Sequence, residues 1–126
     1  SVGDEVIKYV AGCIKQRVKG SGFAGRFGGD EFVLCITDPK QIEEIESLSL
    51  DLIDELYEGY HSELANVSIN VKASIGIAFY PEHGDDSNKV VAAADEAMYF
   101  VKKNGKANYH IYQPEDSEME DLQHTL

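Results

Sequence analysis

The stretch Arg26-Phe-Gly-Gly-Asp-Glu-Phe-Val-Leu-Cys-Ile-Thr37 places two glycines and two acids between two apolar runs. The first run spans 23–27 and the second spans 32–36. Two short strands joined by a glycine-containing turn of about four residues are typical of a β-hairpin. Because the second run is apolar without interruption, it predicts a strand that is buried on both faces.

The turn of this hairpin combines backbone freedom with negative charge. Gly28 and Gly29 carry no Cβ and tolerate positive φ, so a ligand can approach the backbone closely. The neighbouring carboxylates of Asp30 and Glu31 repel each other unless they are solvated or bridged by a cation, and Mg²⁺ is a cation that prefers oxygen ligands. The other interpretation is a polar hairpin tip whose acids face water. The chemistry of the turn alone leaves both interpretations open.

Length and composition predict a single domain with a real core, since the chain has 126 residues of which 43% are hydrophobic. No apolar run approaches the ~20 residues that a membrane span needs, and no signal-peptide pattern opens the chain. We therefore expect a fragment that is not inserted in a membrane. Its first residue is Ser1, which fits a piece of a longer protein. Cys13 and Cys35 lie in apolar patterns and are expected to be buried free thiols.

The net charge of −12 argues against nonspecific binding to nucleic acid, which requires basic patches. It is still compatible with one nucleotide held by a metal ion and a few local cations. Residues 114–126 contribute five acids and no Lys or Arg. This acidic tail has too few apolar groups to fold alone, so we predict a domain at 1–113 followed by a linker or disordered tail at 114–126.

Periodic apolar residues predict the regular elements. Amphipathic helices are expected at 3–18, 40–60 and 88–103. A strand is expected at 68–80, where apolar and other residues alternate, and a shorter one at 107–113. The order helix, hairpin, helix, strand, helix, strand predicts a layered α+β domain, with helices on one or both faces of a mostly antiparallel sheet.

Several single residues have both a structural and a functional interpretation. Asp4 is either an N-terminal cap or an acid that faces a ligand, and Ser87 is the expected cap of the third helix. Gly76 marks a bulge or a close approach of another group. His83 follows the strand at 68–80 and is expected to be a solvated loop residue.

Three lysines crowd the end of the third helix, at positions 102, 103 and 106. They either pair with the negative end of the helix dipole or form a clamp for phosphate.

Taken together, these motifs resemble the GGDEF family of bacterial diguanylate cyclases. Gly28 to Phe32 reproduces the five-residue signature, and Gly3-Asp4 matches the end of an earlier family segment. The other matching motifs are Ser74-Ile-Gly-Ile-Ala78, Ala94-Asp-Glu-Ala-Met-Tyr99 and Lys102 with Gly105-Lys106. The resemblance covers residues 1–113.

The resemblance implies an α/β sandwich with the ferredoxin-like palm of nucleotidyl cyclases. It implies condensation of two GTP into cyclic di-GMP and two pyrophosphates, with Mg²⁺ or Mn²⁺ and with one GTP on each protomer of a homodimer. The domain is then expected in the cytoplasm of a bacterium, fused to sensor or phosphodiesterase domains in a parent protein that is free or membrane-anchored.

The resemblance also assigns roles to residues. Asp30 would be a metal ligand and candidate general base, with Glu31 as the second carboxylate at the metal. Gly28 and Gly29 would line the nucleotide, and Asp4 would accept hydrogen bonds from guanine.

Lys102 and Lys106 would contact phosphates. The family commonly has Arg at the position of Lys106. Lysine offers a single point charge there in place of the bidentate contact that arginine can make with a phosphate.

The resemblance leaves one part of the family pattern unmatched. The family's first strand, with its Asp-x-Asp metal ligand and the following Phe-Lys-x-x-Asn-Asp, is expected upstream of Gly3. We therefore expect this 126-residue chain to be incompetent as a cyclase by itself. The alternative function is a regulatory GGDEF module that binds GTP or a partner and controls an attached phosphodiesterase or sensor domain.

The first prediction concerns product inhibition. The family often carries Arg-x-x-Asp at the positions that read Lys19-Gly20-Ser21-Gly22 here. Because the Asp is absent and the Arg is a Lys, tight inhibition by cyclic di-GMP through this site is not expected. Calorimetric titration with cyclic di-GMP checks this, and a submicromolar affinity that Lys19→Ala abolishes would refute it.

Overall fold

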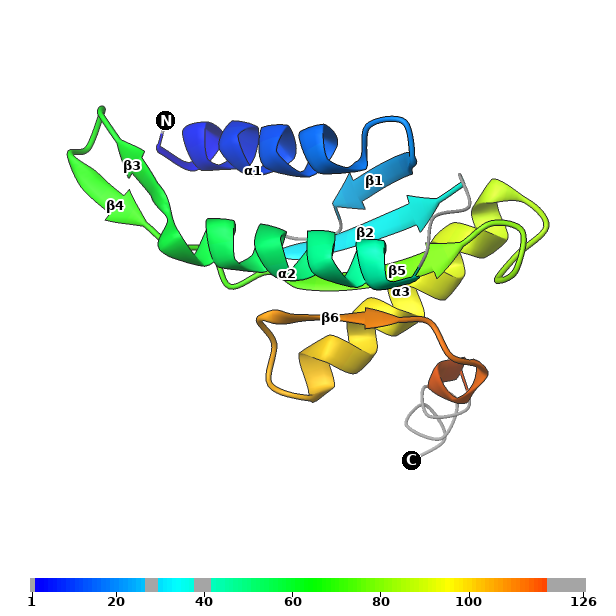
Figure 1. The fold of residues 1–126 in the computed structure, drawn as a ribbon. Helices are drawn as coiled ribbons and strands as arrows, with labels where there is room; N and C mark the ends of the chain where they lie inside the picture. Colours follow the sequence, from blue (N-terminus) through cyan, green and yellow to red (C-terminus); the bar gives the residue numbers. More distant parts are fainter. Residues whose placement is uncertain (1, 27–29, 38–41, 118–126) are drawn as a thin grey trace.

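The computed structural model describes residues 2–26, 30–37 and 42–117 (Figure 1). This part of the chain contains three long helices and six strands. In order they are α1 (Val2–Val18), β1 (Gly22–Arg26), β2 (Glu31–Ile36), α2 (Ile42–Glu58), β3 (Tyr60–Ser62), β4 (Val67–Ile69), β5 (Ser74–Phe79), α3 (Ser87–Lys103) and β6 (Asn108–Ile111). A short helical turn over 114–117 follows β6. Within the described part, no helix is long and apolar enough to cross a membrane.

The main sheet has the strand order β1-β2-β5-β6. The predicted hairpin is confirmed: β1 and β2 are antiparallel, with Gly22 opposite Ile36 and Arg26 opposite Phe32. The pairs β2–β5 and β5–β6 are parallel, so the expectation of a mostly antiparallel sheet was wrong. The physical reason is that α2 and α3 lie in the two connections, and a helix crossover returns the chain to the same end of the sheet.

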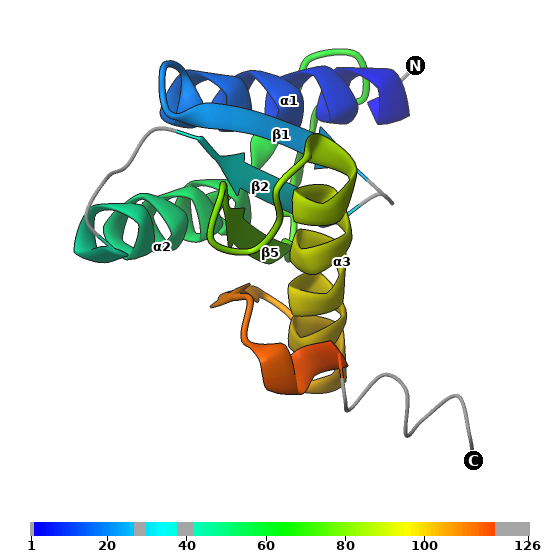
Figure 2. The same cartoon turned by 90° about the vertical axis from the view of Figure 1, so that its right-hand side faces the viewer.

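Helices cover both faces of this sheet (Figure 2). Phe32, Leu34 and Ile36 of β2 belong to a core cluster with residues of α1 and α2. Val33 and Cys35 belong to a second cluster with residues of α3. Because successive side chains of a strand point to opposite faces, this separation confirms that β2 is buried on both sides. The α+β class with a central sheet between helices is therefore confirmed.

Gly76 of β5 lies where the backbone of α3 approaches the sheet. A Cβ at position 76 would be 1.9 Å from Ala94 O and 2.4 Å from Met98 N. Backbone atoms of a helix cannot shift locally in the way that a flexible side chain can. Of the two sequence interpretations of Gly76, the close approach is correct.

The second prediction follows from this contact. Gly76→Ala should lower the free energy of unfolding by at least about 3 kcal/mol, because the new methyl group overlaps backbone on α3. Gly12→Ala is the matched control, since a Cβ at position 12 of α1 meets nothing within 4 Å. That control should be neutral or stabilising by up to about 1 kcal/mol. Urea denaturation measures both, and equal stability of the two variants would contradict the prediction.

The predicted strand at 68–80 is split in the structure. Residues 67–69 pair with β3 in a separate two-stranded ribbon, and only 74–79 join the main sheet. Val71 N donates to Leu56 O at 2.8 Å, which holds the intervening segment against the end of α2. Gly59, with φ of 100°, ends α2 before Tyr60, so the expected helix at 40–60 is shorter than predicted.

The cap of α3 also differs from the expectation. Asp86 is the N-cap, and its Oδ1 accepts a hydrogen bond from Lys89 N at 2.9 Å. Ser87 is the first residue inside the helix. Both residue types can cap, so sequence alone could not distinguish two neighbours in a polar loop. Cys13 and Cys35 are buried free thiols as expected, and burial raises the pKa of Cys35 to about 11.

His83 lies in a turn as expected, but its side chain is half-buried and not solvated. Its Nδ1 accepts a hydrogen bond from Phe79 N at 2.9 Å, and its ring makes edge contacts with Phe79 and Tyr112. Burial lowers the pKa of His83 below its usual range, against a smaller opposing effect of Glu82. The neutral imidazole therefore closes the turn after β5.

The third prediction is a pH dependence of stability. A lowered folded-state pKa means that the unfolded chain binds the His83 proton more readily, so the free energy of unfolding should decline as the pH falls below about 6.5. His83→Asn keeps an acceptor oxygen but does not titrate, so it should show less of this decline. His61→Asn, which removes an exposed imidazole, is the control. Denaturation between about pH 7.5 and pH 5 compares them, and identical pH profiles for all three proteins would refute the prediction.

Candidate functional site

Three of the predicted site residues, Asp30, Glu31 and Lys102, lie where β2, β5 and β6 begin. In the sheet register, Glu31 is opposite Ser74, and Ser74 is opposite Asn108. Asp30 O accepts a hydrogen bond from Ser74 N at 2.8 Å, which fixes the backbone just before β2. The last turn of α3 reaches this end of the sheet, because α3 packs along β5 and β2 and precedes β6 (Figure 1).

Glu31 and Lys102 form an ion pair across this end of the sheet. Glu31 Oε1 lies 2.5 Å from Lys102 Nζ, and the two side chains are 22% and 37% exposed. The hydrogen bond and the charge of Glu31 raise the pKa of Lys102, and the charge of Asp30 adds to this effect. The pair brings together one predicted catalytic carboxylate and one predicted phosphate ligand.

Asp30 lies on the opposite side of the sheet from Glu31. It lines an open hollow together with Tyr57, Asn70, Val71 and Lys72. Tyr57 belongs to α2, which covers the face away from α3. The two consecutive acids therefore face different layers of the sandwich, as expected for neighbours where a strand begins.

This arrangement does not fit one metal ion shared by both carboxylates. Glu31 already pairs with Lys102, whereas Asp30 faces the hollow on the other side. Among the residues that the structure describes, no group of three or more His, Cys, Asp or Glu side chains could hold a metal ion. Binding of Mg²⁺ by Asp30 and Glu31 stays a prediction, and it requires a different arrangement of these side chains.

The other predicted site residues are located to different extents. Lys106 is exposed after α3 with a φ of 62°, and its N donates to Val101 O at 3.0 Å. Asp4 lies in the first turns of α1, but its side chain is outside what the structure describes. Gly28 and Gly29 are also outside the described residues. Their roles stay predictions.

Sequence reasoning missed three residues beside Asp30. They are Tyr57, Asn70 and Lys72. The pattern around Val71, buried between two exposed neighbours, indicated that Asn70 and Lys72 point outward. No sequence signal placed them beside Asp30, because that proximity depends on how α2 and the segment before β5 pack.

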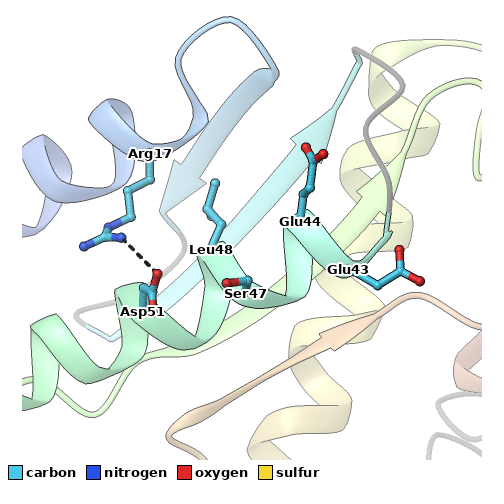
Figure 3. A pocket seen from close by; sticks show the side chains of 6 residues that line it. All are labelled: Arg17, Glu43, Glu44, Ser47, Leu48 and Asp51. Atoms are coloured by element: carbon cyan, nitrogen blue, oxygen red, sulfur yellow. Dashed lines mark ion pairs between the residues drawn. The ribbon is translucent and has the colours of Figure 1, made fainter.

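A second hollow lies between α1 and α2 (Figure 3). Arg17 reaches into it but is already occupied, with Nη1 3.9 Å from Asp51 Oδ2 and Nη2 paired with Glu55. Glu43 and Glu44 add further negative charge. This hollow contains none of the predicted site residues, and its excess of carboxylates disfavours a phosphate ligand.

Comparison with known proteins identifies the family. The model of the family "Diguanylate cyclase, GGDEF domain" matches residues 1–108. The chain therefore belongs to the GGDEF family, and its domain is of the diguanylate cyclase type.

Relatives and a solved structure agree with this assignment. The signaling protein YkoW of Bacillus subtilis is 31% identical over 113 residues, which are 89% of this chain and 14% of YkoW. The bifunctional diguanylate cyclase/cyclic di-GMP phosphodiesterase MucR of Pseudomonas aeruginosa is 31% identical over 112 residues, 89% of this chain and 16% of MucR. The chain thus spans less than a fifth of either relative.

A structure of the GGDEF domain of YfiN (TpbB) from P. aeruginosa matches with a TM-score of 0.73 at 24% identity. The match covers 90% of this chain and 65% of that one. At this identity the likeness establishes the fold, the palm of the nucleotidyl cyclases.

Proposed function

We propose that the parent of this chain is a diguanylate cyclase, which condenses two GTP into cyclic di-GMP and two pyrophosphates. The observation that carries the proposal is the Glu31–Lys102 pair, with Asp30 next to it, at the end of the sheet where the family signature lies. Lys102 is paired with Glu31, and the charge of Asp30 also acts on it. A lysine in such a setting is a local cation that could contact the phosphates of a metal-bound triphosphate. The surface of net charge −12 makes such local cations necessary.

In this reaction each 3′-hydroxyl oxygen forms a bond to the α-phosphorus of the facing GTP, and the bond from that phosphorus to pyrophosphate breaks. Two protomers face each other, because each carries one GTP. The hydroxyl proton passes to a base, for which Asp30 is the candidate. Lys102 and Lys106 contact the phosphates, Gly28 and Gly29 line them, and Asp4 accepts hydrogen bonds from guanine.

Mg²⁺ or Mn²⁺ bound at the carboxylates would neutralise phosphate charge and acidify the attacking hydroxyl. Asp30 is the first candidate ligand, because its side chain faces an open hollow. Glu31 becomes available only when Lys102 leaves it, and a phosphate that draws Lys102 away would release Glu31. Binding of the substrate would then coincide with the transfer of Lys102 from Glu31 to a phosphate.

We further propose that residues 1–126 are inactive by themselves. The support is the resting geometry, in which Glu31 is neutralised and Asp30 faces the other layer. The active parent would carry fused sensor or phosphodiesterase domains and act in the cytoplasm as a homodimer. The relative MucR is a bifunctional diguanylate cyclase/cyclic di-GMP phosphodiesterase, which supports a fused phosphodiesterase domain.

The fourth prediction tests this function in the full-length parent. Asp30→Ala should lower the rate of cyclic di-GMP formation from GTP and Mg²⁺ by at least about a hundredfold, because a group that acts on the reacting phosphate is lost. Asp54→Ala is the control, since Asp54 is an exposed acid on α2. Chromatographic detection of the product measures both. The 126-residue chain in the same assay should form no product.

A parent indifferent to Asp30→Ala, or a 126-residue chain that turns over GTP, would contradict these proposals. The Glu31–Lys102 pair also favours a second candidate, a regulatory module that binds GTP without converting it. That candidate predicts GTP binding without turnover in the parent, and a phosphodiesterase or sensor output that responds to GTP. Loss of turnover in Asp30→Ala but not in Asp54→Ala supports the cyclase, whereas a parent that binds GTP without turnover supports the regulatory module.

A further inference from the structure

The described residues after β6 fold back onto the domain. Residues 114–117 form a helical turn, and Asp116 within it is only 6% exposed. Burying a carboxylate is costly unless its oxygens find donors. The acidic sequence there predicts a linker or disorder, and for residues 118–126 that stays a prediction. Residues 114–117 do not fit that prediction, because Asp116 is buried, and the contacts that make its burial favourable have to be identified.

The carboxylate of Asp116 is held by donors from the strand and the turn that precede it. His110 Nε2 lies 3.0 Å from Oδ2 and 3.1 Å from Oδ1. Gln113 N donates to Oδ2 at 2.8 Å, and Asp116 N donates to Gln113 O at 2.9 Å. The turn is thus closed by a reciprocal pair of bonds and attached to β6 through His110.

Contacts with α3 complete the attachment. The ring of His110 stacks on Phe100 with centroids 4.0 Å apart. Ser117 Oγ donates to a carboxylate oxygen of Glu96 and lies 2.8 Å from the Tyr112 hydroxyl. Glu96 and Phe100 are four residues apart, so they share one face of α3. The turn is bound to the strand and to the helix at the same time.

These contacts lie next to the end of α3 that bears Lys102. Phe100 O accepts hydrogen bonds from Asn104 N at 3.1 Å and from Asn104 Nδ2 at 2.8 Å, so the residue under His110 also anchors the C-cap. Lys102 lies between Phe100 and Asn104 in the sequence. Through His110, the turn therefore contacts the part of α3 that presents Lys102 to Glu31.

We propose that His110, Asp116 and Ser117 form a latch that fastens the chain leaving β6 onto α3. In the latched state, the direction in which the chain leaves the domain is rigidly related to the last turn of α3. Release of the latch lets that turn fray, which changes the position of Lys102. The occupant of this surface is the chain's own segment at 114–117, and the latch is a mechanical connection between whatever follows it and the candidate site.

The fifth prediction tests the latch by amide hydrogen exchange on the 126-residue chain. Asp116→Ala removes the acceptor for His110 and Gln113, and Ser117→Ala removes the link to Glu96. Asp116→Ala should reduce exchange protection of residues 113–117 by about tenfold or more, the effect of losing charge-assisted hydrogen bonds. Both variants should also reduce protection at Lys102, Lys103 and Asn104. Glu115→Ala, in the same turn but exposed, is the matched control.

Each outcome bears on one step of the proposal. If Asp116→Ala exchanges like Glu115→Ala throughout 113–117, the latch does not exist. If 113–117 loosen while the end of α3 keeps its protection, the connection to Lys102 is refuted. Loosening of both segments in Asp116→Ala and Ser117→Ala, and of neither in Glu115→Ala, supports the proposal. None of these readouts involves GTP, so the result is independent of the proposed cyclase function.

Discussion

The packing of α3 against β5 is the contact on which the rest of the structure depends. Gly76 has no Cβ, so the backbone of α3 lies closer to β5 than it could if position 76 carried any other residue. The helix then lies over β2 and β5 and buries Val33, Cys35 and Ala78 beneath it. The same placement brings Lys102 to the start of β2, so the packing of α3 on Gly76 determines which cation meets Glu31.

The candidate site follows from the alternation of side chains where β2 begins. Glu31 faces α3 and pairs with Lys102, whereas Asp30 faces the layer of α2. Lys102 neutralises Glu31, and the charges of both acids raise the pKa of Lys102, with Glu31 having the larger effect. In a chain of net charge −12, this pairing stabilises both groups until a stronger partner arrives.

The latch connects this site to the end of the domain. The hydrogen bonds of Asp116 are local in sequence within 110–117, but the hydrogen bond of Ser117 to Glu96 and the stacking of His110 on Phe100 reach back to α3. Lys102, which pairs with Glu31, and Phe100, which the latch contacts, both lie near the end of α3. Local opening of this last turn therefore couples the latch to the ion pair.

Much of this architecture could be predicted from residue patterns, and the failures have physical reasons. The three helices, the hairpin and the burial of β2 on both faces followed from apolar periodicity. Periodicity could not reveal that the alternating run at 68–80 divides between two sheets, because both parts alternate equally well. Nor could periodicity reveal that His83 contacts the rings of Phe79 and Tyr112, since His83 lies in a turn, where no regular pattern predicts the side-chain direction.

The sequence alone was enough to identify the family and to predict the three helices and a set of candidate site residues, because periodicity and short motifs are properties of neighbouring residues. Only the tertiary structure decided the parallel sense of β2, β5 and β6, the opposite directions of Asp30 and Glu31, and the burial of Asp116. Each of these depends on contacts between residues that are distant in the chain or on a turn that supplies donors, and a pattern of residue types does not contain that information.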